Sequence, residues 1–355
     1  MDVKLIGRLS EASGVSGFES EVREIIKKEV EKYADSVRVD NMGNLIALKK
    51  GTSKNKKKVA LVAHMDEIGL LVKRVEKGFI DFSKFGGIDD STLLGQRVTI
   101  HGKEKIPGII CSKSIFFQKK EDREKPVKKE DLFIDIGAIE KKKKKGEKKE
   151  DEDNKKTGIE KGTPITFNSQ FMKLREHIYC GKSLDDRLGV YCLIDVLKRI
   201  KTCKNDLYCV FSTQEEVGLK GARVAAYGIN PDLAISIDVI PSGDIPPVSK
   251  KESEIALGKG VGVSLYEADG RGTILPESVK NFMMALVKKR KIEYQFEIAE
   301  GGFTEAAIMQ LVKEGLLCCS IGPPVRNAHT PNEIFDERDL EATIRLTEEM
   351  AKNWK

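Results

Sequence analysis

Two histidines and several carboxylates occur in short polar clusters whose residue types suit a metal-dependent hydrolase. Each cluster follows an apolar run or opens an amphipathic segment. The clusters are His64-Met65-Asp66-Glu67, Ser183-Leu184-Asp185-Asp186-Arg187, Ser212-Thr213-Gln214-Glu215-Glu216, Asp238 and His329. Imidazole and carboxylate ligands without cysteine favour Zn, Co or Mn at a hydrolytic site, because structural sites usually take cysteine and a closed coordination shell.

The same set matches the requirements of a pair of divalent cations. Two cations about 3.5–4 Å apart need one bridging carboxylate and about two further protein ligands each. We expect Asp185 to bridge, with His64, Glu216, Asp238 and His329 as the terminal ligands. The residue types alone leave open how these four ligands pair.

Two further carboxylates have expected roles beside the ligands. Glu215 stands next to Glu216, where a general base for the attacking water belongs. Asp66 lies two residues after His64 and can accept the other ring N–H of that imidazole, which fixes its tautomer. His101 and His177 have no such context and are interpreted as barrel or surface residues.

Each motif also has an ordinary structural explanation when it is taken alone. Glu215-Glu216 can begin an exposed helix, and Asp185-Asp186 can cap a helix that starts near Leu188. We favour the functional interpretation because five separate clusters stand at strand ends or helix starts and together complete one dinuclear site.

The surrounding pattern predicts the elements that position these clusters. Continuous apolar runs at 59–63, 207–211, 233–237 and 316–321 are typical of strands covered on both faces. Helical periodicity appears between them at 188–200, 279–288 and 305–313. The alternation predicts an α/β domain with helices flanking a mixed sheet. Ligands of such sheets bind outside the carboxyl ends of the strands, so the polar clusters are expected to converge.

The stretch from Gly69 to Gln170 has a different pattern. It is rich in glycine and in short alternating runs, with almost no helical period. Closely spaced short strands predict a small β-barrel inserted into the α/β domain. The expected division is therefore a discontinuous catalytic domain of residues 1–68 and 171–355, with an inserted barrel domain of residues 69–170.

Composition excludes a disordered or membrane-spanning chain. Hydrophobic residues make up 40% and charged residues 33%, and no apolar stretch approaches the roughly 20 residues that cross a bilayer. The first residues lack the apolar core of a signal peptide. Seven cysteines without a Cys-x-x-Cys pair indicate reduced, buried thiols. We expect a cytoplasmic protein without a membrane partner.

The net charge of +6 does not indicate nucleic-acid binding. It arises from 62 basic and 56 acidic residues, and much of the excess lysine lies in one tract within 119–161. The Lys-rich part at 141–156 alternates lysine with glutamate and aspartate, which is typical of a solvated loop or helix extension. Heavy use of lysine and glutamate with little glutamine fits a protein from a hot environment.

The motifs together resemble the signature blocks of the tetrahedral (TET) aminopeptidases. This metallopeptidase family includes glutamyl and leucyl aminopeptidases, and some members were once labelled endoglucanases. The matching blocks are Ala63-His64-Met65-Asp66-Glu67-Ile68-Gly69, Gly181-Lys182-Ser183-Leu184-Asp185-Asp186-Arg187, Thr213-Gln214-Glu215-Glu216-Val217-Gly218, Ile237-Asp238 and His329-Thr330-Pro331. The resemblance implies a phosphorylase/hydrolase-like catalytic domain with an inserted β-barrel used for dimerisation, and six dimers assembled into a tetrahedral dodecamer.

The resemblance also implies roles at the matching positions. His64 and Asp238 would hold one metal, Glu216 and His329 the other, and Asp185 would be shared, with Glu215 as the base and Asp66 supporting His64. The chain departs from the family at Gly302-Phe303-Thr304-Glu305-Ala306, usually Gly-Gly-Thr-Asp-Ala, and at Asn327, commonly tyrosine. Both departures are expected near the substrate pocket. The Lys-rich tract is also longer than usual.

The sequence therefore predicts an aminopeptidase that removes N-terminal residues from peptides with two divalent cations, Zn or Co being favoured. A related metal-dependent deacylase or carboxypeptidase is the closest alternative. A glycosidase would leave the two strand-end histidines without a role. A non-catalytic assembly or nucleic-acid-binding protein would not need Glu215 beside a ligand.

Overall fold

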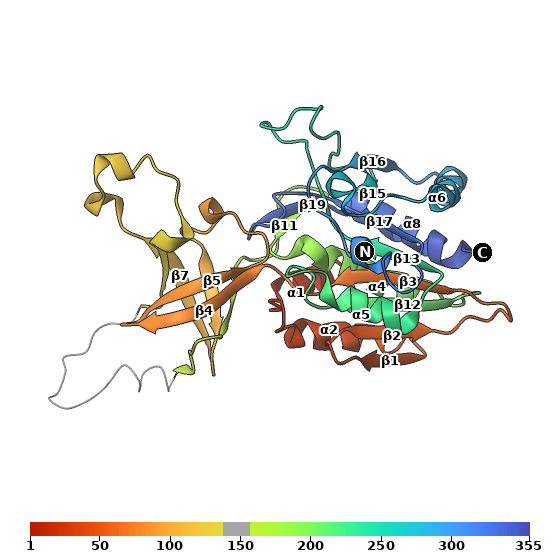
Figure 1. Ribbon diagram of the computed structural model, residues 1–355, viewed down its shortest axis with the longest axis horizontal. Coiled ribbons are helices and arrows are strands. Elements are labelled where there is room, and N and C mark those ends of the chain that lie inside the picture. Colours follow the sequence, from red (N-terminus) through yellow and green to blue (C-terminus); the bar gives the residue numbers. More distant parts are fainter. Residues whose placement is uncertain (138–156) are drawn as a thin grey trace.

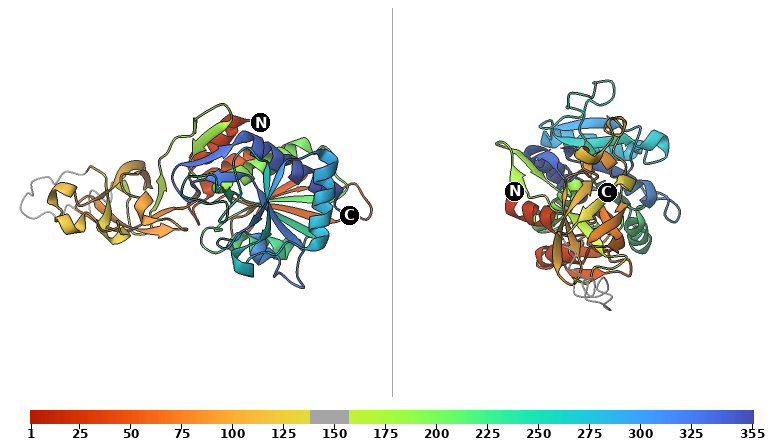
Figure 2. Two further views of the ribbon diagram at one scale, coloured as in Figure 1. Left: turned by 90° about the horizontal axis from the view of Figure 1, so that it is seen from above. Right: turned by 90° about the vertical axis from the view of Figure 1, so that its left-hand side faces the viewer.

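The computed structural model describes residues 1–137 and 157–355, so the Lys-rich tract at 141–156 lies outside the described residues. An α/β part carries both chain ends, and a closed β-barrel projects from it (Figure 1). Figure 2 shows the barrel extending away from the α/β part along the long axis of the molecule. The α/β fold with an inserted barrel is thereby confirmed.

The α/β part is built on a mixed sheet of eight strands in the order β1-β2-β12-β3-β13-β17-β15-β16. The central strands β12, β3, β13 and β17 are parallel neighbours, and they are the four apolar runs predicted as buried strands. The bounds are β1 Ser36–Val39, β2 Leu45–Lys49, β3 Lys58–His64, β12 Asp206–Ser212, β13 Leu233–Ile237, β15 Val261–Tyr266, β16 Tyr294–Ile298 and β17 Cys318–Gly322.

Helices cover both faces of this sheet. Along β3, Val59 and Leu61 pack into one hydrophobic core, whereas Ala60 and Val62 pack into the other, which explains the continuous apolar run. The first core is covered by α1 Val3–Glu11, α2 Ser20–Val30, α4 Leu184–Arg199, α6 Glu277–Arg290 and α8 Glu337–Asn353. The second core is covered by α5 Lys220–Ile229 and α7 Ala306–Met309.

The helix predicted over 305–313 is shorter than expected, because α7 ends at Met309. The side chain of Gln310 donates to the carbonyl of Gly272 at 3.0 Å, outside the helix. Lys313 then takes a φ of 56°, in the left-handed region, and the chain turns toward β17. Tertiary contacts therefore override a helical pattern of apolar residues.

The barrel closes in the order β4-β5-β8-β7-β6-β9. Its interior is filled by apolar side chains that include Val72, Phe82 and Ile100, all almost completely buried. The strands are β4 Gly69–Glu76, β5 Phe79–Phe85, β6 Arg97–His101, β7 Lys105–Ser112, β8 Leu132–Asp135 and β9 Pro164–Phe167. Short 3-10 helices lie at Asp90–Thr92, Ile115–Phe117, Lys120–Asp122 and Lys129–Asp131, with a further one in the α/β part at Ala268–Gly270.

A second, five-stranded sheet links the barrel to the α/β part in the order β10-β11-β19-β18-β14. Its strands are β10 Met172–Lys173, β11 Ile178–Gly181, β14 Ile240–Pro241, β18 Pro324–Arg326 and β19 Glu333–Asp336. The chain therefore leaves the main sheet just after His64 at the end of β3 and returns through β11 just before α4.

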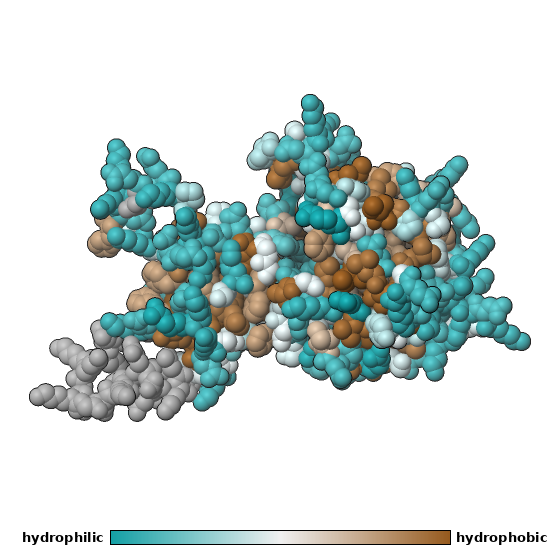
Figure 3. Space-filling model, viewed as in Figure 1, coloured by the Kyte–Doolittle hydropathy of each residue, from teal (hydrophilic) through white to brown (hydrophobic). Residues whose placement is uncertain are grey.

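The cysteines are reduced and mostly buried, as the sequence predicts. All seven cysteines are free, and all except Cys111 are buried. Hydrophilic side chains project around most of the outline, while hydrophobic surface gathers on the visible faces of both parts (Figure 3). Within residues 1–137 and 157–355, no helix has the length and apolar character that a bilayer crossing requires.

Candidate metal centre

The fold brings the predicted ligands to one edge of the main sheet. His64 is the last residue of β3, and Asp238 follows β13 directly. Glu216 lies in the loop after β12, and Asp185 lies in the first turn of α4. His329 comes from the loop between β18 and β19. The parallel strands end at the same edge, which is why residues far apart in sequence meet here.

Asp185 lies between the two imidazoles. Its Oδ1 is 3.0 Å from Nε2 of His64, and its Oδ2 is 3.3 Å from Nε2 of His329. Nε2 of His64 is also 4.0 Å from Oδ1 of Asp238, and Nε2 of His329 is 3.9 Å from Oε2 of Glu216. One carboxylate therefore presents a separate oxygen to each half of the cluster, as a bridging ligand does.

The donor atoms fall into two groups that are each close enough to surround a cation. Asp185, Glu216 and His329 offer donor atoms within 4.8 Å of one another, and so do His64, Asp186 and Asp238. Oε1 of Glu216 is buried and has no hydrogen-bond partner among the described residues. A buried acceptor without a donor is costly, so this donor set fits bound cations.

Asp186 was not among the predicted ligands. Its Oδ1 accepts a hydrogen bond from the amide of Gly189 at 2.9 Å, and its Oδ2 is buried without a partner among the described residues. The peptide bond that joins Asp185 and Asp186 is cis. The sequence signal was the Asp-Asp pair itself, of which only Asp185 was predicted as a ligand.

The cluster brings several carboxyl groups together in a buried place, and this changes their pKa values. Burial raises the pKa of Glu215 and Asp238 well above the ordinary carboxyl range, and it raises the pKa of Glu216 to about 8. Burial also opposes ionisation of Asp185, but hydrogen bonds from His329 and His64 lower its pKa below the usual value. Divalent cations would remove this repulsion, because an opposite charge favours the ionised carboxylate.

Asp66 supports the cluster differently from the expectation. Its main-chain carbonyl lies 3.2 Å from Nδ1 of His64, whereas its carboxylate oxygen Oδ1 lies 3.6 Å away. The carboxylate instead accepts hydrogen bonds from the amides of Glu215 and Glu216 at 2.9 and 3.2 Å and from the hydroxyl of Ser16 at 2.6 Å. Asp66 therefore fixes the main chain that carries Glu215 and Glu216.

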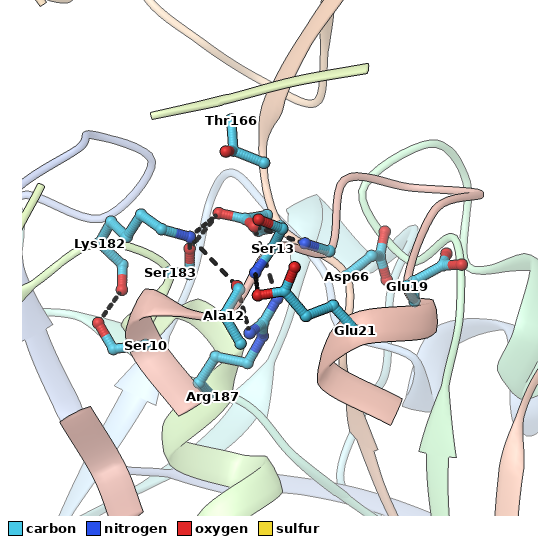
Figure 4. A network of polar contacts seen from close by, with 12 residues as sticks. Ser10, Ala12, Ser13, Glu19, Glu21, Asp66, Thr166, Lys182, Ser183 and Arg187 are labelled. Atoms are coloured by element: carbon cyan, nitrogen blue, oxygen red, sulfur yellow. Dashed lines mark hydrogen bonds and ion pairs between the residues drawn. The ribbon is translucent and has the colours of Figure 1, made fainter. Parts of the chain in front are cut away.

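Beneath the ligands lies a buried polar network that the sequence did not predict. Nζ of Lys182 contacts Oε2 of Glu67 at 2.6 Å, and the hydroxyl of Ser183 donates to the same carboxylate. Oε1 of Glu67 accepts from the amide of Gly14 at 2.8 Å and lies 3.7 Å from Nη2 of Arg187. Figure 4 shows the side chains of Lys182, Ser183 and Arg187 meeting in this network. The available signal was a set of charged residues inside the motifs that carry the ligands.

The barrel part also reaches the cluster. The carbonyl of Gly87, in the loop after β5, lies 3.0 Å from Nδ1 of His329. At the preceding Gly86 the φ is +75°, and a Cβ atom would stand 2.6 Å from Oε2 of Glu216. A side chain at this position would therefore be strained and would collide with the cluster.

A cavity of about 320 Å³ opens beside the cluster. Its walls include the loop after β16, with Phe303 and Thr304, but neither Glu305 nor Asn327. The first departure from the family pattern therefore touches the cavity through Phe303, whereas the second, Asn327, does not line it. His101 lies on β6 of the barrel and His177 pairs with Glu337 at 2.7 Å, so both lie outside the cluster, as expected.

Comparisons with known proteins show similarity along most of the chain. A family model described as M42 glutamyl aminopeptidase matches residues 43–346. Aminopeptidase APDkam598 from the archaeon Desulfurococcus kamchatkensis superposes with a TM-score of 0.91 at 33% identity, covering 99% of this chain and 94% of that one.

Two Pyrococcus proteins are also similar. The lysyl aminopeptidase of Pyrococcus furiosus is 29% identical over 360 residues, covering 100% of this chain and 98% of its own. The TET1 peptidase of Pyrococcus horikoshii, described as able to assemble into a tetrahedron or a large octahedral shell, has a TM-score of 0.86 at 28% identity, with 99% of each chain covered.

Proposed function

Because the chain belongs to the M42 glutamyl aminopeptidase family, whose members are metal-dependent peptidases, we propose that it removes N-terminal residues from peptides with two divalent cations. His64 and Asp238 would hold one cation, Glu216 and His329 would hold the other, and Asp185 would be shared between them. The observation that carries this assignment is the position of Asp185, whose two oxygens lie 3.0 and 3.3 Å from the two imidazoles.

Zn and Co are the cations that we favour, because the donors are imidazole and carboxylate without thiolate. Bound cations supply Lewis acidity, which polarises the scissile carbonyl and lowers the pKa of the attacking water. Asp186 lies beside His64 and Asp238, and its buried Oδ2 has no hydrogen-bond partner among the described residues, so it is a further candidate donor for the first cation.

Glu215 is the proposed general base. Its Oε2 lies 3.9 Å from Nε2 of His64, so it borders the reacting region. The hydrogen bond from its amide to Asp66 fixes the main chain at this residue. Glu215 accepts the proton of the attacking water and delivers it to the amine that leaves, while the walls of the cavity hold the first residue of the peptide.

The test is a Glu215→Gln protein, which keeps the size of the side chain and removes the base. We expect it to bind two cations per chain by elemental analysis and to lose kcat by about 10²–10⁴-fold on an amino-acyl 4-nitroanilide. The N-acetylated anilide should resist the wild-type enzyme. A variant that binds cations and keeps near-normal kcat would show that another group takes the proton.

The assembly and the cellular context are part of the same proposal. Residues 69–170 form an inserted dimerisation domain, and 1–68 with 171–355 form the catalytic domain. The barrel strands run from Gly69 to Phe167, and Phe116 and Phe117 near them are 87% and 76% exposed, which suits a contact with another copy. The similarity to a peptidase described as forming a tetrahedron supports a dodecamer built from dimers. Free, mostly buried cysteines support a cytoplasmic enzyme.

A further inference from the structure

The cavity beside the cluster has acidic side chains in its walls and no basic side chain except the two histidines of the cluster, among the described residues. Among the described residues that line it, no lysine or arginine occurs, and the two histidines belong to the cluster itself. Away from the cluster, its charged side chains are the carboxylates of Glu267 and Glu297. At about 320 Å³ the cavity lies at the small end of ligand pockets, which suits one amino-acid side chain.

Glu267 is engaged with the protein. It is 2% exposed, and its carboxylate accepts hydrogen bonds from the amide of Thr273 and the hydroxyl of Thr304, both at 3.0 Å. These contacts hold the loop that contains Thr304 against the end of β15. Glu267 therefore adds negative charge to the cavity wall while its oxygens stay committed to the loop.

Glu297 is placed differently. It lies on β16 opposite Ser264 of β15, and the hydroxyl of Ser264 donates to its Oε2 at 2.6 Å. No hydrogen bond to Oε1 and no ion pair is found for it among the described residues, and the residue is only partly buried. Burial raises its pKa, the bond from Ser264 lowers it, and the neighbouring charge of Glu267 raises it further. Glu297 is thus a carboxylate at the cavity wall that pairs with no cation of the described residues.

We propose that this cavity receives the side chain of the substrate's first residue and that Glu297 selects a cationic side chain, lysine or arginine. The inference rests on the proposed function, because the cavity is a specificity pocket only if peptides are cleaved at the cluster. A cationic side chain pairs with Glu297, whereas an acidic one meets two carboxylates at close quarters. A leucine side chain gains only burial and leaves the carboxylate with the Ser264 hydroxyl but without a cation.

The relatives do not decide this point. The family is described by glutamyl activity and one Pyrococcus relative by lysyl activity, so the names differ on the charge of the preferred residue. The carboxylates of Glu267 and Glu297 in the cavity wall of this chain favour a first residue with a positively charged side chain.

The experiment compares 4-nitroanilides of lysine, arginine, leucine and glutamate on the full-length enzyme loaded with Zn or Co. We expect kcat/KM to be highest for lysine or arginine and lowest for glutamate. Glu297→Gln should lower kcat/KM for lysine at least about tenfold and change leucine cleavage much less. Leucine cleavage by the variant also shows that it is folded and metal-loaded.

Glu300→Gln is the matched control. It removes the same charge three residues away, at an exposed position that does not line the cavity, and should leave the ranking unchanged. If leucine or glutamate is the best substrate, or if both variants alter lysine cleavage equally, the selectivity inference is wrong while the aminopeptidase proposal stands. If the loaded enzyme cleaves none of the four, both proposals are overturned.

Discussion

Glu67 and Lys182 form an ion pair of 2.6 Å whose side chains are only 1% and 4% exposed. The pair joins the segment that follows His64 to the segment that precedes Asp185, and these two segments carry ligands of both proposed cations. Burial lowers the pKa of Lys182, and the charge of Glu67 opposes that change. The Glu67–Lys182 ion pair therefore holds these two segments together, and removing either side chain would destabilise the charge of the other.

We predict that Lys182→Met costs about 3–5 kcal/mol in the free energy of unfolding, because it breaks a buried ion pair and leaves Arg187, at 3.7 Å, as the remaining cation beside Glu67 among the described residues. Adding Glu67→Gln should not recover that loss, since the double variant also takes the Glu67 carboxylate away from the buried Arg187. Urea unfolding at one fixed protein concentration measures the free energy of unfolding of the wild type and of each variant. Lys57, paired with Asp232 at 3.1 Å on the surface, is the control, and Lys57→Met should cost about 0–1 kcal/mol. Equal costs for the two lysines would contradict the prediction.

Asp66→Asn should weaken metal binding about 10–100-fold and lower kcat, because an amide cannot accept all three hydrogen bonds that now reach this carboxylate. Competition with a coloured chelator measures the affinity. Ser16→Ala removes only one of the three bonds and should have a much smaller effect. A normal affinity in Asp66→Asn would show that the Glu215-Glu216 segment is held by other contacts.

Two glycine substitutions should have opposite effects on stability. A Cβ at Gly322 would lie 1.5 Å from the carbonyl oxygen of Asp238, so Gly322→Ala must displace the chain at a proposed ligand and should cost more than about 3 kcal/mol. Gly228 lies in α5, where a Cβ would meet no described atom within 4 Å apart from its chain neighbours and the backbone of the helix itself, and Gly228→Ala should stabilise by about 0.5–1 kcal/mol. Thermal unfolding distinguishes the two, and tolerance of alanine at Gly322 would contradict the close approach.

The preference for a cationic first residue should depend on pH. The pKa of Glu297 is raised, so on acidification it becomes neutral sooner than an ordinary glutamate of pKa about 4.3. Its neighbours are the Ser264 hydroxyl and the Glu267 carboxylate, and no described lysine or arginine pairs with it. The ratio of lysine to leucine kcat/KM is therefore highest above the raised pKa and falls as the pH drops through it.

Taking the ratio cancels titrations of the metal cluster, because both substrates share them. The same measurement on Glu297→Gln should give a ratio that no longer changes with pH. A ratio in the wild type that stays constant from neutrality down to about pH 4.3 would argue against a role for this carboxylate.

Much of the fold could be predicted because its central strands are covered on both faces. The alternating burial of Val59 and Ala60 in two different cores makes β3 read as one apolar run. The five strands of the second sheet are two to four residues long, too short for any period to appear. The helix at 305–313 was overestimated because the contact of Gln310 with Gly272 depends on tertiary structure.

The candidate site was predictable to a similar degree. Ligands at strand ends follow from the pattern, and the structure brings His64, Asp185 and His329 together. The partners of Asp66 were not predictable, because its carboxylate binds main-chain amides, which leave no mark in the sequence. The role of Lys182 was not predicted either, because a lysine in a motif is usually solvent-exposed.

The contact between Gly87 and His329 means that the α/β part does not complete the candidate site by itself. The carbonyl that orients this imidazole belongs to the loop after β5, and both chain crossings to the barrel run directly into ligand-bearing segments. Excising residues 69–170 to obtain a smaller enzyme would therefore remove the carbonyl that orients His329. It would also cut the chain a few residues after His64. Designers who wish to resize this protein should keep the barrel and alter its outer surface instead.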